Sequence, residues 1–115
     1  MARAGDHAAI VIANPLSAAH RKDVVASAAA NQLPTIYEFR PFVTDGGLVS
    51  YGPPVLPFYR GAAGYVDKIL RGAAPGSLPV QQATKFELVI NLKTAKTLGI
   101  TIPPTLLALS NEVIE

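Results

Sequence analysis

The chain has 115 residues, of which 50% are hydrophobic and 16% are charged, and its formal net charge is +2. This length allows one domain, and this hydrophobic content excludes disorder of the chain as a whole. The absence of cysteine excludes disulfides, thiolate nucleophiles and cysteine-based metal sites. The one basic cluster, Lys85, Lys93 and Lys96, is too sparse for a nucleic-acid interface and is typical of a solvated helix surface.

The first predicted element is a strand over Ala8 to Ala13, an uninterrupted apolar run that indicates burial on both faces. Ser17 is a candidate N-cap for a helix that runs to about Asn31. A second strand over about 34–37 completes a β-α-β unit, and a crossover helix of this length implies parallel strands. The unit predicts an α/β domain with a partial, doubly wound parallel sheet.

The segment 36–52 contains two short apolar runs and a turn. Pro41 begins the predicted turn, and Gly46 and Gly47 close it, so that the two strands have almost no crossover between them. Short strands rich in aromatic and β-branched residues, with polar groups where they stop, are typical of a sheet edge that presents side chains to a ligand. We interpret this segment as a binding edge.

A long amphipathic helix is predicted over Val55 to Arg71, because its apolar residues recur at three- and four-residue spacings. Gly72 is a plausible stop for this helix. Gly61 and Gly64 are costly inside a helix, which suggests close packing against another element. The following residues, Ala73 to Gln82, have no periodicity and are predicted to form an extended connection.

The last third of the chain alternates between short elements. Residues 86–91 alternate apolar and polar side chains, which predicts a strand. A short helix follows over about 93–98 and ends at Gly99, and one more turn of helix follows over 105–109. Residues 111–115 are interpreted as a tail.

The residues that most often carry catalysis or metal binding are sparse. The two histidines, His7 and His20, are expected to be solvated, so no metal site is predicted. No glycine-rich phosphate loop is present, and no cofactor is predicted. Glu38 and Asp45 come nearest to an acid and base pair, but their pattern does not support one, and we expect no enzymatic activity.

Polar and aromatic residues do gather where the predicted strands stop. In open α/β sheets, ligands bind beyond the carboxyl ends of the strands. The side chains that should line such a cleft are those that follow or end the first three strands. These predicted ligand-binding residues are Asn14, Glu38, Phe39, Ser50 and Tyr51.

A purely structural reading of the same residues is equally compatible with the pattern. Asn14 would cap a helix, and Phe39 would belong to the core. Glu38 would pair with Arg40, and Tyr51 would pack under a helix. The sequence leaves both readings open.

Three segments, 36–53, 59–82 and 84–115, closely resemble the C-terminal end of the substrate-binding proteins of ABC uptake transporters. The segment KFELVINLKTAKTLG, residues 85–99, is specific to this resemblance. The subgroup in question is similar to tryptophan and tyrosine binders.

The resemblance implies a type I periplasmic-binding fold, in which a ligand lies between two lobes. The chain would form the C-terminal lobe, with the N-terminal lobe absent. Residues 8–52 would be the β-α-β-β core of that lobe, 53–82 a hinge-crossing helix and connection, and 83–115 the returning strand and C-terminal helices.

The implied function is capture of a small organic solute such as an amino acid, without catalysis, for delivery to an ABC permease. The family is periplasmic, whereas the apolar run at 8–13 is too short for a signal peptide, so the chain as given is expected to be cytoplasmic. One alternative is a truncated remnant that binds nothing and forms a homodimer through the helix at 55–71. Another is a small cytosolic enzyme that uses the same cleft.

Overall fold

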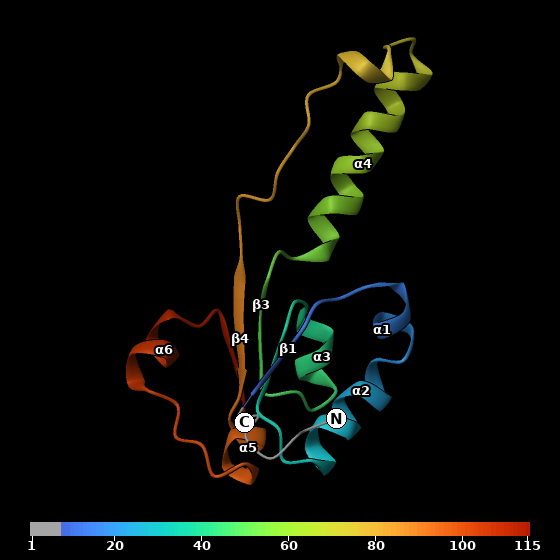
Figure 1. Cartoon of the computed structure of the whole chain (residues 1–115). Helices are drawn as coiled ribbons and strands as arrows, with labels where there is room; N and C mark the ends of the chain where they lie inside the picture. Colours follow the sequence, from blue (N-terminus) through green and yellow to red (C-terminus); the bar gives the residue numbers. More distant parts are fainter. Residues whose placement is uncertain (1–7) are drawn as a thin grey trace.

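The computed structural model describes residues 8–115 and shows a five-stranded mixed sheet in the order β1-β2-β3-β4-β5 (Figure 1). Three neighbouring strands, β1, β2 and β3, are parallel, β4 is antiparallel to β3, and β5 is parallel to β4. The strands are β1 (Ala9–Val11), β2 (Thr35–Tyr37), β3 (Val49–Gly52), β4 (Glu87–Asn91) and β5 (Glu112–Ile114). The helices are α1 (Pro15–Ala19), α2 (Arg21–Ala30), α3 (Arg40–Thr44), α4 (Val55–Leu70), α5 (Leu92–Thr97) and α6 (Pro104–Leu109), with a 3-10 turn, η1, at Pro75–Ser77.

The crossover between β1 and β2 contains two helices, where the sequence predicted one helix capped by Ser17. Asn14 is the N-cap of α1, because its side chain accepts a hydrogen bond from the Ser17 backbone N–H. The Ser17 hydroxyl binds back to the Asn14 N–H, which completes a capping box. His20 then separates α1 from α2.

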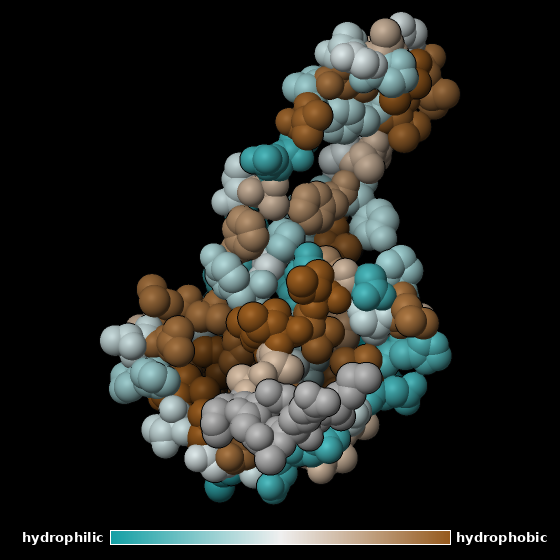
Figure 2. All heavy atoms as spheres, viewed as in Figure 1, coloured by the Kyte–Doolittle hydropathy of each residue, from teal (hydrophilic) through white to brown (hydrophobic). Residues whose placement is uncertain are grey.

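The strand β1 is less buried than its apolar sequence suggested. Ile10 is 78% exposed and Ile12, which follows the strand, is 75% exposed, so the prediction of burial on both faces is wrong. The physical reason is that β1 is an edge strand, and no described helix covers the face on which Ile10 lies. Figure 2 shows hydrophobic atoms gathered over the strands on the face that it presents.

The predicted turn between the second and third strands is a short helix, α3. Pro41 lies in the first turn of α3, where a missing N–H has no cost. The side chains of Phe42 and Val43, which belong to the same helix, are buried. This helix provides the crossover that parallel pairing of β2 and β3 requires, so the expectation of almost no crossover is also wrong. Gly46, which was predicted to close a turn, has φ of +109° and follows the end of this helix.

The core lies on the side of the sheet that α2 and α3 cover. Val25, Tyr37 and Phe42 form its centre, and the rings of Tyr37 and Phe42 stack with their centroids 5.0 Å apart. Burial raises the pKa of the Tyr37 hydroxyl, which therefore stays neutral in the core.

The C-terminal part follows the predicted strand and helices, with one addition. Glu112 to Ile114 form β5, although the sequence was interpreted as a tail there. The strand is short, and it forms because β4 offers a free edge to which its backbone can bond in parallel register. Gly99, with φ of +67°, follows α5 and ends it as predicted.

The helix α4 projects from the sheet as an arm, and residues 71–86 return along it (Figure 1). The chain measures 56 × 32 × 22 Å and has a radius of gyration of 17.6 Å, whereas a compact domain of this length has about 13 Å. No residue of α4 is buried. Gly72, with φ of +100°, follows its C-terminus as predicted.

Close packing at Gly61 and Gly64, which the sequence suggested, is not found. A Cβ atom at Gly61 would lie 3.8 Å from the Gln81 Oε1 atom, an ordinary contact, and one at Gly64 would meet nothing within 4 Å. The two glycines lie on a helix whose described surroundings leave room around both of them.

Candidate functional site

The parallel strands β1, β2 and β3 end at the same edge of the sheet, and the arm begins there after Gly52. This edge contains the residues that the sequence analysis placed in a ligand cleft. The strand-end positions are therefore neighbours, as parallel pairing requires. Their side chains, however, make different contacts.

Asn14 and Glu38 both engage the backbone. Asn14 caps α1, as the structural reading proposed. The Glu38 Oε2 atom accepts a hydrogen bond of 3.1 Å from the Ala13 N–H, and this bond joins the ends of β1 and β2. The proposed pairing of Glu38 with Arg40 does not occur, because Arg40 is bound to another carboxylate.

Phe39 is partly buried and packs against the core cluster of Val25, Tyr37 and Phe42. It is also the N-terminal boundary residue of α3, with an extended backbone. Its ring is thus largely committed to packing, as the structural reading proposed. An aromatic surface for a ligand at this strand end would have to come from another residue.

Ser50 and Tyr51 lie on opposite faces of β3, since successive strand residues alternate. Ser50 is 1% exposed and lines a cavity on the α3 side. Tyr51 is 56% exposed and stacks on Phe86 on the other face, with ring centroids 5.5 Å apart. The five residues therefore do not converge on one surface as expected, and Tyr51 does not pack under a helix. Their role in ligand binding stays a prediction.

The cavity at Ser50 has a volume of about 280 Å³ and contains two charged residues that the sequence analysis missed, Arg40 and Glu87. Glu87 reaches it because β4 returns antiparallel to β3 and places Glu87 directly opposite Gly52. The signal in the sequence was present but indirect. An antiparallel return of the strand at 86–91 would have placed its first residues beside the end of β3.

Arg40 forms a bidentate ion pair with Glu112, in which the Nε–Oε2 and Nη2–Oε1 distances are both 2.6 Å. The bond ties the start of α3 to β5. The hydrogen bond from Arg40 lowers the pKa of the Glu112 carboxyl below its ordinary value, and the same bond raises the pKa of Arg40. Sequence reasoning missed this pair because it did not predict β5.

We expect the Arg40–Glu112 pair to stabilise the fold at neutral pH and to lose its effect in acid. A carboxyl whose pKa is lower in the folded state contributes stability above its unfolded pKa, and this contribution disappears as the pH falls through the folded pKa. Both side chains are partly exposed, so the loss in Glu112→Gln should be only about 0.5 kcal/mol at pH 7. Urea unfolding at pH 7 and pH 3 measures it. Glu115→Gln is the control, and an equal loss at both pH values would contradict the assignment.

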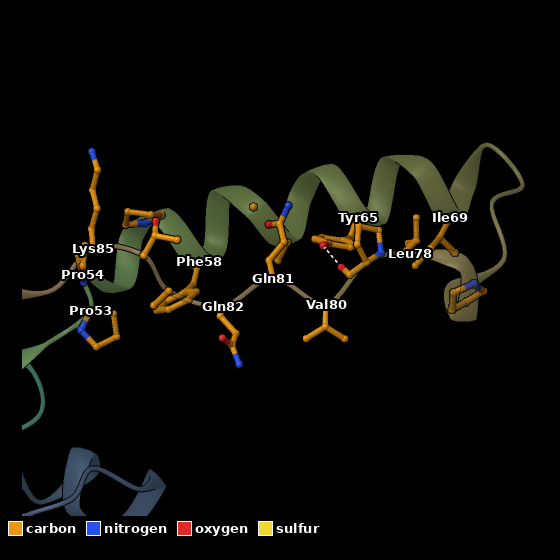
Figure 3. Close-up of a pocket in the computed structure, with 17 residues that line it drawn as sticks. Pro53, Pro54, Phe58, Tyr65, Ile69, Leu78, Val80, Gln81, Gln82 and Lys85 are labelled. Atoms are coloured by element: carbon orange, nitrogen blue, oxygen red, sulfur yellow. Dashed lines mark hydrogen bonds between the residues drawn. The ribbon is translucent and has the colours of Figure 1, made fainter.

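A second cavity, of about 560 Å³, lies along the arm between α4 and the returning segment (Figure 3). Phe58, Tyr65 and Ile69 line it from the helix, and Leu78 and Val80 line it from the returning chain. The Tyr65 hydroxyl donates a hydrogen bond to the Pro79 carbonyl oxygen, which holds the two segments together. The groove is apolar and open, in keeping with a packing surface.

The described residues contain neither a metal-binding cluster nor a membrane-spanning helix. Within residues 8–115, no group of three His, Asp or Glu side chains is placed to hold a metal ion. His20 lies 3.4 Å from Asp23, and both side chains are exposed, whereas His7 lies outside the described residues. In the same range, no helix combines the length and the apolar character needed to cross a membrane.

The sequence of the chain matches a known protein family. Residues 1–114 match the sequence profile of the family described as ABC transporter substrate-binding protein. The chain belongs to this family. The resemblance stated from residues 36–115 is thereby confirmed, although none of the curated proteins compared with the chain matches it.

Solved structures show the same fold. A conserved domain protein from Vibrio cholerae O1 biovar El Tor is 32% identical and has a TM-score of 0.86, and the match covers 90% of this chain and 35% of the other. A domain from Streptococcus pneumoniae in complex with L-Trp is 29% identical and has a TM-score of 0.81, and the match covers 95% of this chain and 38% of the other. The fold is also shared by a ligand-free, open substrate-binding protein with adhesive properties from Clostridium difficile. It is 23% identical and has a TM-score of 0.57, and the match covers 91% of this chain and 35% of the other.

The chain thus spans little more than a third of the length of these structures. The predicted fold class, a partial parallel α/β sheet corresponding to one lobe, is confirmed. The matches extend over 90% or more of the chain, which is too much to leave out the arm. The matches to these two structures, with TM-scores of 0.86 and 0.81, therefore include most of the arm.

Proposed function

We propose that the chain is part of a solute-binding component of an ABC uptake transporter, which captures a small organic solute such as an amino acid and delivers it to an ABC permease. The observation that carries this proposal is the match of sheet and arm together to structures of similar proteins, with a TM-score of 0.86 in one case. The family membership supplies the class of function. The similar domain from Streptococcus pneumoniae was solved with L-Trp, which supports an amino acid.

The three parts of the chain have distinct roles in this proposal. Residues 8–52 form the core of the C-terminal lobe, 53–82 cross to an N-terminal lobe, and 83–115 return. The exposed apolar face of α4 supports the crossing, because a helix without a buried residue is stable only when another surface covers its apolar side. The strand ends at the foot of the arm would then face the ligand.

The predicted ligand-binding residues contribute unequally to the proposed cleft. Ser50 offers a buried hydroxyl on one face of β3, and Tyr51, which stacks on Phe86 on the other face, offers the exposed part of its ring to an aromatic solute. Asn14 and Glu38 shape the edge by holding the backbone at the ends of β1 and β2. Phe39 supports the edge from the core side.

The proposal places no catalysis in the chain. A substrate-binding family binds solutes rather than converting them, and it acts in the periplasm, where we place the protein that contains this chain. Turnover of a substrate that is lost in Glu38→Gln would favour the rival reading as an enzyme. Within residues 8–115, the one described partner of the Glu38 carboxylate is the Ala13 backbone, which suits a structural role.

We expect the separate chain to bind amino acids weakly. Tight binding requires walls on both sides of a small ligand, and the chain supplies one of them. Calorimetric titration with a panel of amino acids should show dissociation constants well above about 1 μM. A micromolar or tighter complex with the monomeric chain would contradict this expectation.

The function itself is tested by restoring the second wall. We expect a chimera that joins the chain to the part of the Vibrio cholerae protein outside the match to bind one member of the panel at least about a hundredfold more tightly, if that part encloses the ligand. Tyr51→Ala in the chimera should weaken an aromatic ligand and leave an aliphatic one unchanged. A well-folded chimera that binds no amino acid would contradict the proposed function.

A further inference from the structure

The face of the sheet opposite the core carries an apolar row that crosses all five strands. The strand register joins its members in the order Ile10, Ile36, Val49, Ile90 and Val113. Val11 packs against the core, so Ile10 and its row lie on the face away from the core. Ile90 is 1% exposed, whereas Ile10 is 78% exposed. Within residues 8–115, the row is therefore covered at β4 and bare at β1.

The backbone of β1 is free along its outer edge as well. The Ala9 N–H donates a hydrogen bond of 2.9 Å to the Pro34 carbonyl oxygen, on the side of β2. Successive N–H groups of a strand point to opposite edges, so the Ile10 N–H points away from β2. No strand formed by residues 8–115 pairs with β1 there. Residues 8–13 contain no charge and no proline, which are the usual protections of an edge strand, so this edge is typical of a strand that has a neighbour.

The connections among the first three strands cannot place a helix over Ile10. Connections between parallel strands are right-handed, so two connections that run in the same direction across a sheet lie on the same face. The connections from β1 to β2 and from β2 to β3 run in the same direction, and Val25 of α2 meets Phe42 of α3 in the core. A helix on the other face of β1 requires a connection that runs the opposite way. Such a connection needs parallel strands beyond the outer edge of β1.

We propose that the free edge and the bare face of β1 are the docking site of a strand and a helix from the part of the protein outside this chain. The strand pairs in parallel with β1, and the helix that follows it packs its apolar side on Ile10 and Ile12. The similar structures have the length for such a unit, because the matches cover only 35% and 38% of them. The inference rests on the proposed function, in which the chain is part of a larger protein.

The test follows the Ile10 amide by hydrogen exchange. In the separate 15N-labelled chain, the Ile10 N–H should exchange almost as fast as in an unfolded peptide, while the Val11 N–H, which points toward β2, should be protected. The part of the Vibrio cholerae protein outside the match is then joined to the chain, or added to it as a separate polypeptide. We expect both forms to slow the exchange of Ile10 at least about a hundredfold and to leave Val11 protected.

Ile10→Lys tests the bare face. In the separate chain the side chain is exposed, so the substitution should change the Tm by less than about 2 °C. In the chimera the lysine would lie under the docked helix and should lower the Tm by about 5 °C or more. Ala26→Lys, at an exposed position of α2, is the matched control and should change neither Tm by more than about 2 °C.

The outcomes separate the docking site from solute binding. Fast exchange of Ile10 in both the joined and the added form would overturn the docking site. Protection of Ile10 in the separate chain would also overturn it, because a second copy would then hold the edge. A chimera that binds an amino acid while Ile10 exchanges fast would leave the proposed function standing without the docking site. Protection of Ile10 without amino acid binding would support the docking site and count against the proposed function.

Discussion

Replacing Val66 and Leu70 in α4 by aspartate is expected to convert the separate chain from a dimer into a monomer. Val66 is 54% exposed and Leu70 is 82% exposed, and with Tyr59, 73% exposed, they form a stripe along one side of the helix. These positions recur at helical spacing, so that their side chains share a face. Within residues 8–115 no element covers this stripe, and a second copy is the partner available to the isolated chain.

The strength of the expected association follows from the apolar area of the stripe on α4. An apolar patch of about 400 Å² corresponds to about 10 kcal/mol at 25 cal/mol per Å², before the cost of association is subtracted. A two-fold dimer buries the same patch on both copies and is the simplest closed arrangement. Association should therefore prevail at micromolar concentration, and two buried aspartates should reverse it.

Light scattering at low micromolar concentration measures the mass. Arg60→Glu and Lys68→Glu change charges on the polar part of α4, outside the stripe, and serve as matched controls that should leave the dimer intact. Phe58 and Ile69, which are 46% and 40% exposed, line the groove toward the returning segment, so charges there should disturb the arm as well. A wild-type chain that is monomeric and stable at this concentration would contradict the prediction.

Gly52→Ala is expected to cause the largest loss of stability among single substitutions at the candidate site. A Cβ atom at Gly52 would lie 2.0 Å from the Glu38 carbonyl oxygen and 3.0 Å from its carbonyl carbon. No rotamer change can relieve a collision with the backbone, so β2 and β3 would have to move apart. Glu38 also binds the Ala13 N–H, and the movement would therefore reach β1.

The expected cost is about 3 kcal/mol, which corresponds to a fall in Tm of about 10 °C or more for a domain of this size. Thermal unfolding followed by circular dichroism measures it. Gly64→Ala is the matched control, because a Cβ atom there meets nothing within 4 Å and alanine favours a helix by about 1 kcal/mol. A Gly52→Ala variant as stable as the wild type would show that the two strands can separate at little cost.

Local sequence was sufficient to predict α4, β4 and the stops at Gly72 and Gly99. The periodicity of α4 lies entirely within sixteen residues, and both glycines adopt the positive φ that a helix end favours. These features depend on neighbours along the chain. They can therefore be read without knowledge of the fold, and the family resemblance was carried by the same segments.

The sequence alone also placed the candidate site at the carboxyl ends of three strands, although it predicted a crossover only between the first two of them. It could not assign the side chains. Asn14 was available both to cap a helix and to face a ligand, and only the structure shows that it caps α1. Ser50 and Tyr51 were grouped because they are adjacent, although adjacent strand residues point to opposite faces.

Tertiary structure alone decided the features that depend on distant partners. α3 forms rather than a turn because Phe42 and Val43 are buried against strands elsewhere in the chain, and β5 forms because β4 leaves an edge open. Glu112 meets Arg40, 72 residues away, and Glu87 meets the face of Ser50 only because β4 runs antiparallel to β3. Such contacts are set by the register between strands, and no local pattern of residues specifies that register.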